Sequence, residues 1–139
     1  MEQMMNIQAL VDALNNAAQL SRKDYHLTLG RLCQFLGGIK PDLPVCYSDG
    51  KSPGRAGSYR GYYCDLSFSD AKEPVTSGAF LAACREALGG TFEGYKGGDY
   101  VMSDGTPLWR SEYGESSGVA IVDAVADRSA VLLVTKQLD

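Results

Sequence analysis

Apolar residues recur at every third or fourth position over residues 7–20, and polar side chains occupy the positions between them. This spacing predicts an amphipathic helix. A second helix is predicted to begin after Thr28, whose hydroxyl can cap the first turn, and to end at the glycine pair 37–38. Because the polar stretch 21–24 between them is short, the two helices are expected to form a hairpin.

A third helix and two strands are predicted further along the chain. Residues 74–76 are predicted to open the helix, and the glycine pair 89–90 is predicted to close it. Residues 44–47 form a short apolar run before a turn sequence, which predicts a strand. Residues 59–68 alternate between an apolar face and an aromatic-rich face, so we expect one continuous strand there.

The last third of the chain is predicted to be β-structure. Residues 91–118 are rich in glycine and lack a long apolar run, which predicts short strands and structured loops. Residues 119–125 and 130–135 are apolar runs on either side of a turn, so we expect a hairpin at the centre of a sheet. The predicted fold class is α+β: an N-terminal helical hairpin followed by a mostly antiparallel β-sheet with one packed helix.

Length and composition indicate one folded domain. The chain has 139 residues, of which 45% are hydrophobic and 22% charged, and these values are typical of a globular domain. We expect residues 1–38 to form the hairpin and residues 39–139 to form a β-rich part. No stretch approaches the roughly 20 apolar residues of a membrane-spanning helix, so no membrane partner is expected.

Charge and cysteine content narrow the expected partners. The chain has 13 basic and 17 acidic residues, hence a formal net charge of −4, and this charge disfavours duplex nucleic acid. The four cysteines include no Cys-x-x-Cys pair, so no metal is expected. The first eight residues lack the apolar run of a signal peptide, and we therefore expect reduced thiols in a cytosolic protein.

One enzyme-like motif occurs, but its context argues against catalysis. Residues 114–118 match the Gly-x-Ser-x-Gly elbow of serine hydrolases, with Ser116 at the position of the nucleophile. That elbow needs a helix after the serine and a histidine later in the chain, whereas the single histidine, His26, comes earlier. The acidic residues of the glycine-rich region more commonly support turns than acid/base chemistry. We therefore expect no catalytic residue and no cofactor.

A local cationic patch is predicted in the first half of this acidic chain. Residues 50–63 contain Lys51, Arg55, Arg60 and three tyrosines, and no acid. Guanidinium groups bind phosphate through two N–H donors, and tyrosine rings can stack on a purine. The equally weighted alternative is a loop that leads into an ordinary strand.

Two further segments have a composition that suits nucleotide binding. Residues 91–100 combine aromatic rings, a lysine and a glycine pair whose backbone N–H groups can approach an oxyanion closely. Residues 106–110 contain the only tryptophan, Trp109, which suits a core as well as a ligand platform. Such segments can hold a small nucleotide in a cavity without converting it.

Three stretches, in this order, resemble a family encoded by phages. They are SYRGYY at residues 58–63, TFEGYKGGDYVM at residues 91–102 and TPLWRSEYGESSG at residues 106–118. The chain resembles the anti-Thoeris signal sponges, the first type of Thoeris anti-defence protein, from about residue 44 to the C-terminal hairpin. The N-terminal helices match this family only in pattern.

The resemblance implies a non-enzymatic protein in the cytoplasm of an infected bacterial host. Members of the family capture cyclic ADP-ribose isomers made by a bacterial TIR-domain enzyme and leave them intact, so that the defence effector is not activated. They are homo-oligomers: dimers whose interface forms two pockets can join into hexamers. Some members also hold cyclic di- or trinucleotides of the CBASS defence system at a separate site between subunits.

Site residues are carried over by position. Phe92 would stack on the adenine, and Arg60 and Lys96, with the backbone of Gly97 and Gly98, would meet the pyrophosphate. The implied ligand-binding set is completed by Arg55, Tyr95, Trp109 and Tyr113. For the second, cyclic-oligonucleotide site, the candidates are Arg22, Lys23 and Arg31.

Two other classes of function stay open. An enzyme that degrades such signals would use Ser116 or an acidic residue, with His26 as the base. An inhibitor that binds a host protein would dock through the aromatic surface. Residues 110–112 are more charged than we expect of relatives at these positions. The resemblance therefore does not indicate which isomer of the signal would bind.

Overall fold

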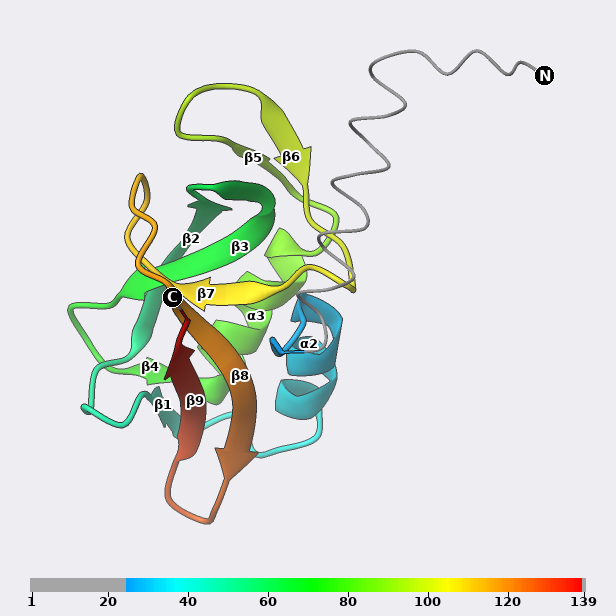
Figure 1. The fold of residues 1–139 in the computed structure, drawn as a ribbon. Coiled ribbons are helices and arrows are strands. Elements are labelled where there is room, and N and C mark those ends of the chain that lie inside the picture. Colours follow the sequence, from blue (N-terminus) through cyan, green and yellow to red (C-terminus); the bar gives the residue numbers. More distant parts are fainter. Residues whose placement is uncertain (1–24, 139) are drawn as a thin grey trace.

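The computed structural model describes residues 25–138 (Figure 1). The predicted helix over residues 7–20 lies outside these residues, as do Arg22 and Lys23, and with them the predicted helical hairpin. The described part of the chain is α+β, with two helices, a seven-stranded sheet and a separate two-stranded sheet.

The first described helix, α2 (Leu29–Gly37), has the bounds that the sequence predicts. The Thr28 hydroxyl accepts a hydrogen bond from the Arg31 backbone N–H at 3.4 Å, and so caps the first turn as expected. Leu29, Leu32 and Leu36 are buried on one face of the helix, at the spacing of an amphipathic helix.

The next helix, α3 (Ser77–Ala87), begins later than predicted. Residues 75–76, expected in its first turn, form the short strand β4 (Val75–Thr76), which pairs antiparallel with β1 (Pro44–Cys46). Thr76 keeps an extended backbone and acts as the N-cap, since its hydroxyl accepts from the Ala79 N–H at 3.2 Å. The prediction placed Thr76 inside the helix, whereas an N-cap residue has a non-helical backbone.

The predicted single strand over residues 59–68 is wrong. The chain forms a hairpin of β2 (Pro53–Tyr59) and β3 (Tyr62–Asp70), joined by a two-residue turn at Arg60 and Gly61. Gly61 has φ of 105°, which lets the chain reverse there. Side-chain alternation continues on both sides of so short a turn, and the alternation alone therefore did not reveal it.

The seven-stranded sheet has the order β2-β3-β7-β8-β9-β1-β4. Its pairs are antiparallel except for β3 with β7 and β1 with β9, so the sheet is mixed but mostly antiparallel, as predicted. The predicted C-terminal hairpin is confirmed inside the sheet. The remaining strands of this sheet are β7 (Leu108–Arg110), β8 (Val119–Ala126) and β9 (Val131–Gln137).

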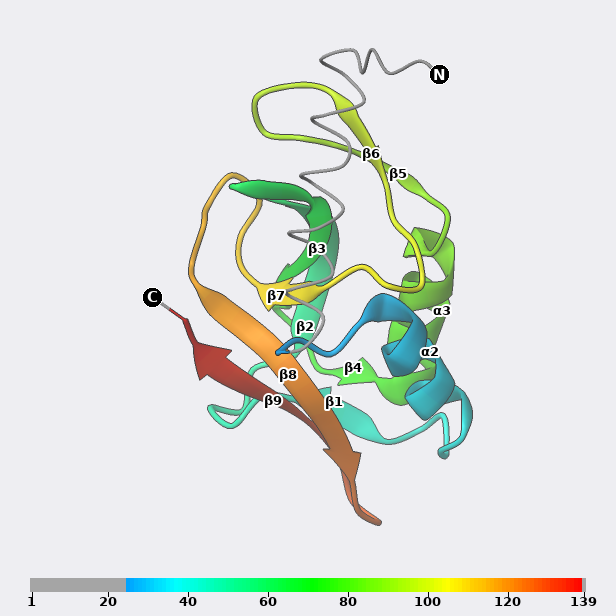
Figure 2. The same ribbon diagram turned by 45° about the vertical axis from the view of Figure 1, so that its right-hand side comes forward.

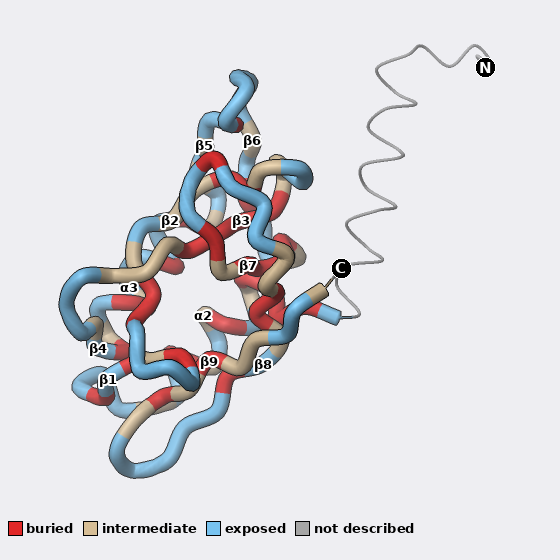
Figure 3. Tube along the Cα trace, turned by 60° about the vertical axis from the view of Figure 1, so that its left-hand side comes forward, coloured by how far each residue is buried: buried red, intermediate tan, exposed pale blue. Residues whose placement is uncertain are grey.

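The sheet has two differently covered faces. Both helices lie on one face (Figure 2), and the main core forms between them and the sheet, where the buried segments gather (Figure 3). Successive residues of a strand point to opposite faces. Accordingly Leu108 belongs to the main core, whereas its neighbour Trp109 belongs to a smaller cluster with Tyr59 and Ala120.

A second hairpin, formed by β5 (Thr91–Glu93) and β6 (Asp99–Val101), extends beyond the β2–β3 end of the molecule (Figure 1). Its base is fixed to the end of α3, because the Gly89 N–H donates to the Met102 carbonyl at 2.8 Å and the Met102 N–H donates to the Gly90 carbonyl at 3.0 Å. Neither helix of residues 25–138 has the length and apolar character needed to cross a membrane.

Candidate functional site

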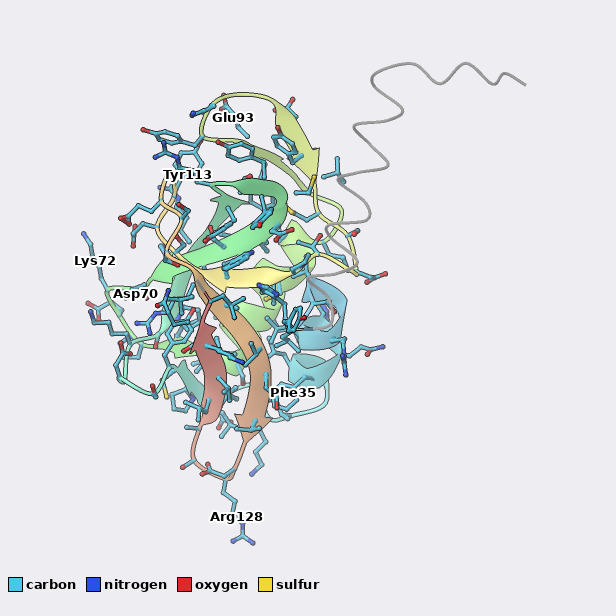
Figure 4. All side chains as sticks on the ribbon, viewed as in Figure 1. Phe35, Asp70, Lys72, Glu93, Tyr113 and Arg128 are labelled. Carbon is cyan, nitrogen blue, oxygen red and sulfur yellow. The ribbon has the colours of Figure 1, made fainter. Side chains whose placement is uncertain are left out.

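A cavity of about 430 Å³ lies where β2, β3, β5 and the β7–β8 loop meet. We call it the upper cavity. Glu93 on β5 and Tyr113 on the loop lie at this end of the molecule (Figure 4). The lining residues are Arg55, Ala56, Gly57, Ser58, Ser67, Ser69, Phe92, Glu93, Glu112 and Tyr113.

Three serines of the β2–β3 hairpin line one side of the upper cavity. The Ser58 hydroxyl donates to the Tyr63 carbonyl at 2.6 Å, and the Ser67 hydroxyl donates to the Gly57 carbonyl at 3.2 Å. The Ser69 hydroxyl accepts from the Arg55 N–H at 3.0 Å. Since the protons of Ser58 and Ser67 are already donated, their oxygens are best placed to accept hydrogen bonds from hydroxyl or amino groups of a ligand.

Two aromatic side chains line the upper cavity from different elements. Phe92 on β5 is partly buried and packs against the main core, whereas Tyr113 on the β7–β8 loop is 51% exposed. Gly57 allows Tyr113 to approach β2 closely, because a Cβ at this position would lie 3.3 Å from the tyrosine ring. Both rings offer a stacking surface to a planar ligand.

Arg60 joins three segments that are distant in the sequence. Its guanidinium donates to the Gly114 carbonyl at 2.9 Å and lies 4.7 Å from the centre of the Tyr95 ring. Tyr95 in turn meets Tyr113 edge to face, with ring centres 5.9 Å apart. The turn of the β2–β3 hairpin, the β5–β6 hairpin and the β7–β8 loop are thus held together beside the upper cavity. We call Arg60, Tyr95, Tyr113 and Gly114 the rim cluster.

The tip of the β5–β6 hairpin does not line the upper cavity. Lys96 is exposed, and the Gly97 N–H donates to the Gly94 carbonyl at 2.8 Å, so this N–H already has a partner within the turn. Gly97 and Gly98 have φ of 100° and 85°. The two glycines therefore allow the chain to reverse at the tip of the hairpin.

Trp109 is a core residue on the face of the sheet opposite α2 and α3. It is only 4% exposed and stacks on Tyr59 with ring centres 4.1 Å apart. Its indole N–H donates to Asp65 Oδ2 at 2.9 Å, and His26 packs against it at 4.5 Å. Of the two roles that the sequence left open for Trp109, the core role is the one it has here, and it is absent from the cavity lining.

Charges at the upper cavity are mixed. Arg55 lines it together with Glu93 and Glu112, all of them exposed. The sequence pointed to Arg55 and, among the acidic residues of the glycine-rich region, to Glu112, but not to Glu93, Ser67 or Ser69. The serines had a detectable signal, since Ser67 and Ser69 are two residues apart on a strand and therefore share a face.

Arg110, in the charged run of residues 110–112, is held by a separate network. It donates to Asp70 at 2.9 and 3.1 Å and to Asp49 at 2.8 Å, and it lies over the Tyr47 ring at 3.9 Å. The Lys51 N–H and Arg110 lower the pKa of Asp49, while burial raises the pKa of Tyr47. Arg110 thus fixes the β1–β2 loop to the end of β3.

The second cavity, also of about 430 Å³, lies beside α2 and α3. We call it the helix cavity. Arg31, nominated for a second ligand site, lines it together with Arg85, whereas Arg22 and Lys23 lie outside the described residues. The lining residues are Thr28, Gly30, Arg31, Cys33, Gln34, Arg85, Leu88 and Asp104.

The residues of the rejected hydrolase motif have no elbow geometry. Ser116 is exposed in the β7–β8 loop, and a strand follows it, whereas the motif requires a helix. His26 is buried against Trp109. Within residues 25–138, no group of three or more histidine, cysteine or acidic side chains is placed to hold a metal ion.

Comparison with known proteins gives no relative: the chain matches no family model, no curated protein and no solved structure.

Proposed function

We propose that this chain is a phage-encoded sponge that binds a cyclic ADP-ribose isomer in the upper cavity and holds it intact in the cytoplasm of the infected bacterium. The observation that carries the proposal is the meeting of two aromatic rings, a guanidinium and serine hydroxyls around about 430 Å³ of space. Sequestration of the signal would keep the Thoeris effector inactive.

The lining suits the parts of such a ligand. An adenine can stack on Phe92 or Tyr113. Ribose hydroxyls can donate to the oxygens of Ser58 and Ser67, whose own protons are committed to the backbone. Arg55 offers two N–H donors to a pyrophosphate oxygen pair.

The acidic side chains limit the ligand to one of low charge. Glu93 and Glu112 line the same cavity as Arg55, and the whole chain carries a net charge of −4. A polyanion would be repelled, whereas a single pyrophosphate needs few cations. Arg60, in the rim cluster, and the exposed Lys96, at the tip of the β5–β6 hairpin, are the cations that can supplement Arg55 when the ligand is bound.

Assembly forms part of the proposal. We propose that a second copy of the chain completes the upper cavity, that residues 1–38 contribute contacts between copies, and that dimers join into hexamers. Arg31, with Arg22 and Lys23, is the proposed second site for cyclic di- or trinucleotides of CBASS. Light scattering of the purified full chain, with and without each nucleotide, measures the number of copies and any change on binding.

The decisive experiment is recovery of the bound molecule. The purified full chain is mixed with the nucleotide product of an activated TIR-domain enzyme, free ligand is removed, and the protein is heat-denatured. Release of an unchanged nucleotide that activates the effector supports the sponge. A nucleotide mixture that keeps its full activity in the presence of the protein would overturn the proposal and favour an inhibitor that binds a host protein through the exposed Tyr95 and Tyr113.

A second candidate function is degradation of the signal. It is favoured by one observation, the two carboxylates, Glu93 and Glu112, that line the same cavity as the proposed ligand groups. One carboxylate would act as a general base on water. In the same experiment, degradation predicts continuous loss of the signal at substoichiometric protein, and Glu112→Gln would abolish that loss.

A further inference from the structure

The helix cavity places a thiol beside two cationic side chains. Cys33 on α2 lines it together with Arg31 and Arg85, and Asp104 contributes the one carboxylate. This cavity shares no lining residue with the upper cavity. A ligand that carries both carboxylates and sulfur would therefore find complementary groups here.

A second thiol lies directly behind Cys33. Cys84 on α3 is fully buried, and its thiol donates a hydrogen bond to the Cys33 sulfur. Helices α2 and α3 pack against each other. None of the four cysteines, all of which lie in the described part of the chain, is in a disulfide, and the other two, Cys46 and Cys64, are half-buried on strands β1 and β3.

The arrangement divides the chemistry between the two thiols. The hydrogen bond from Cys84 lowers the pKa of Cys33 to about 7, with Arg85 acting in the same direction and burial and Asp104 opposing it. The pKa of Cys84 is raised, because this thiol supplies the proton and is buried. Cys33 lines the cavity whereas Cys84 is fully buried, so Cys33 is the thiol that a ligand can reach. It is therefore the nucleophile of the pair, since the thiolate is the reactive form of cysteine.

We propose that Cys33 is a thiol–disulfide exchange site for an anionic low-molecular-weight disulfide such as glutathione disulfide, and that Cys84 resolves the adduct. In the first step the Cys33 thiolate attacks one sulfur of the disulfide, a new S–S bond forms, and one glutathione leaves as the thiolate. In the second step Cys84 attacks the Cys33 sulfur, its proton passes to the departing glutathione sulfur, and the second glutathione is released as the thiol. Two protein thiols are oxidised to one disulfide, and one glutathione disulfide is reduced to two thiols.

The test is to incubate the full chain with glutathione disulfide, to block the remaining thiols and to identify the modified cysteines by peptide mass spectrometry. The wild-type chain is expected to form a disulfide between Cys33 and Cys84. Cys84→Ala is expected to stop at the first step and to retain one glutathionyl group on Cys33. Cys33→Ser is expected to leave Cys84 unmodified. Cys64→Ser, which removes a half-buried thiol elsewhere, is the matched control and should behave as the wild type.

Two rate measurements sharpen the test. The rate at which Cys33 reacts with glutathione disulfide should rise with pH, with a midpoint at about 7, as the Cys33 thiolate forms. Arg85→Gln should slow the reaction with glutathione disulfide several-fold more than the reaction with the uncharged hydroxyethyl disulfide. The proposal is overturned if Cys33 in the wild-type chain reacts no faster than Cys46 and Cys64, or if the glutathionyl group of Cys84→Ala lies on another cysteine.

Discussion

The main core and the rim cluster are held together in opposite ways. In the main core, apolar side chains from both helices and from the sheet bury one another, and contacts such as Phe68 with Phe80, ring centres 5.0 Å apart, are shared among many neighbours. In the rim cluster, a few single contacts join three separate segments, for example Arg60 to the Gly114 carbonyl.

This difference teaches where stability and binding reside. A packed core contributes through area removed from water, so its loss weakens the whole domain. The rim cluster is more exposed, with Tyr95 at 50% and Tyr113 at 51%. Changes there should alter the shape of the upper cavity with little effect on folding. The two regions can therefore be separated by measuring unfolding and nucleotide affinity on the same variants.

The largest effect is expected in the core. Phe68→Ala should lower the free energy of unfolding by about 3 to 5 kcal/mol, because this buried ring is lost and a void remains. Urea denaturation followed by circular dichroism measures the change. If the folded fraction of Phe68→Ala also lost its affinity for the nucleotide, the contributions of the main core to stability and of the upper cavity to binding could not be separated. Phe68→Leu, which retains most of the volume, should lose less stability.

The next largest effect is expected on binding. Tyr113→Ala should weaken nucleotide affinity by about 1 to 3 kcal/mol, roughly tenfold or more, through loss of one stacking ring. Its unfolding free energy should stay within about 0.5 kcal/mol of the wild type, since the side chain is half exposed. Calorimetric titration measures the affinity. Tyr25→Ala, at a tyrosine that is 62% exposed and outside the cavity lining, is the control.

Two other cavity variants extend this prediction. Phe92→Ala should also weaken binding, and Arg60→Glu should weaken it further by replacing a cation beside the pyrophosphate with an anion. Unchanged affinity in Tyr113→Ala, Phe92→Ala and Arg60→Glu, with the fold intact, would show that the upper cavity is not the binding site.

A matched pair of glycine variants sharpens the comparison between folding and shape. Gly50 and Gly114 have nearly equal φ, 89° and 88°, so alanine at either position should cost about 1 to 2 kcal/mol of backbone strain. A Cβ at Gly50 meets no atom within 4 Å, whereas a Cβ at Gly114 would lie 2.8 Å from the Tyr95 ring. Because the half-exposed Tyr95 ring can shift to relieve this clash, the two variants should still unfold alike.

Only Gly114→Ala should also lose affinity, by a few-fold, because the displaced Tyr95 ring loosens its contacts with Arg60 and Tyr113. Unfolding and titration of both variants under the same conditions measure the two effects. Equal affinities of Gly50→Ala and Gly114→Ala would mean that the position of Tyr95 does not matter to binding.

The sequence predicted the parts of the fold that follow from short-range patterns. The cap at Thr28, the stripe of α2 and the C-terminal hairpin all depend on residues a few positions apart, and all are confirmed. The β2–β3 turn was missed because the alternation of side chains between the two faces continues on both sides of it. The bounds of α3 were wrong by three residues because a cap and a helical residue look alike in sequence.

The candidate site was less predictable, for a physical reason. Composition identified Arg55 and Phe92, and the family resemblance added Tyr113; the fold does bring these three residues to one cavity. Composition did not reveal that Glu93 and Glu112 share this cavity, since their positions depend on strand pairing across distant segments. Equally, the burial of Trp109 depends on its hydrogen bond to Asp65, 44 positions away, which no local pattern encodes.

The smallest effect is expected at the β8–β9 turn, which contains Arg128 and lies at the opposite end of the molecule from Tyr113 (Figure 4). Asp127 accepts hydrogen bonds from the Ser129 N–H at 2.7 Å, the Ser129 hydroxyl at 2.8 Å and the Ala130 N–H at 3.0 Å. These bonds, the Ser129 N–H foremost, lower the pKa of Asp127 below the usual 3.8. A carboxylate with a lowered pKa stabilises the fold above its unfolded-state pKa, and this contribution is lost as the pH falls through the lowered value.

Asp127→Asn should therefore flatten the loss of stability between about pH 5 and about pH 2, while leaving affinity in the upper cavity unchanged. The side chain is fully exposed, so the change should be small, and urea denaturation at the two pH values measures it. Asp123→Asn, a change of the same kind on the neighbouring strand β8, is the control for the loss of one negative charge. If Asp127→Asn and Asp123→Asn had the same pH dependence, general charge repulsion and not the turn hydrogen bonds would account for the effect.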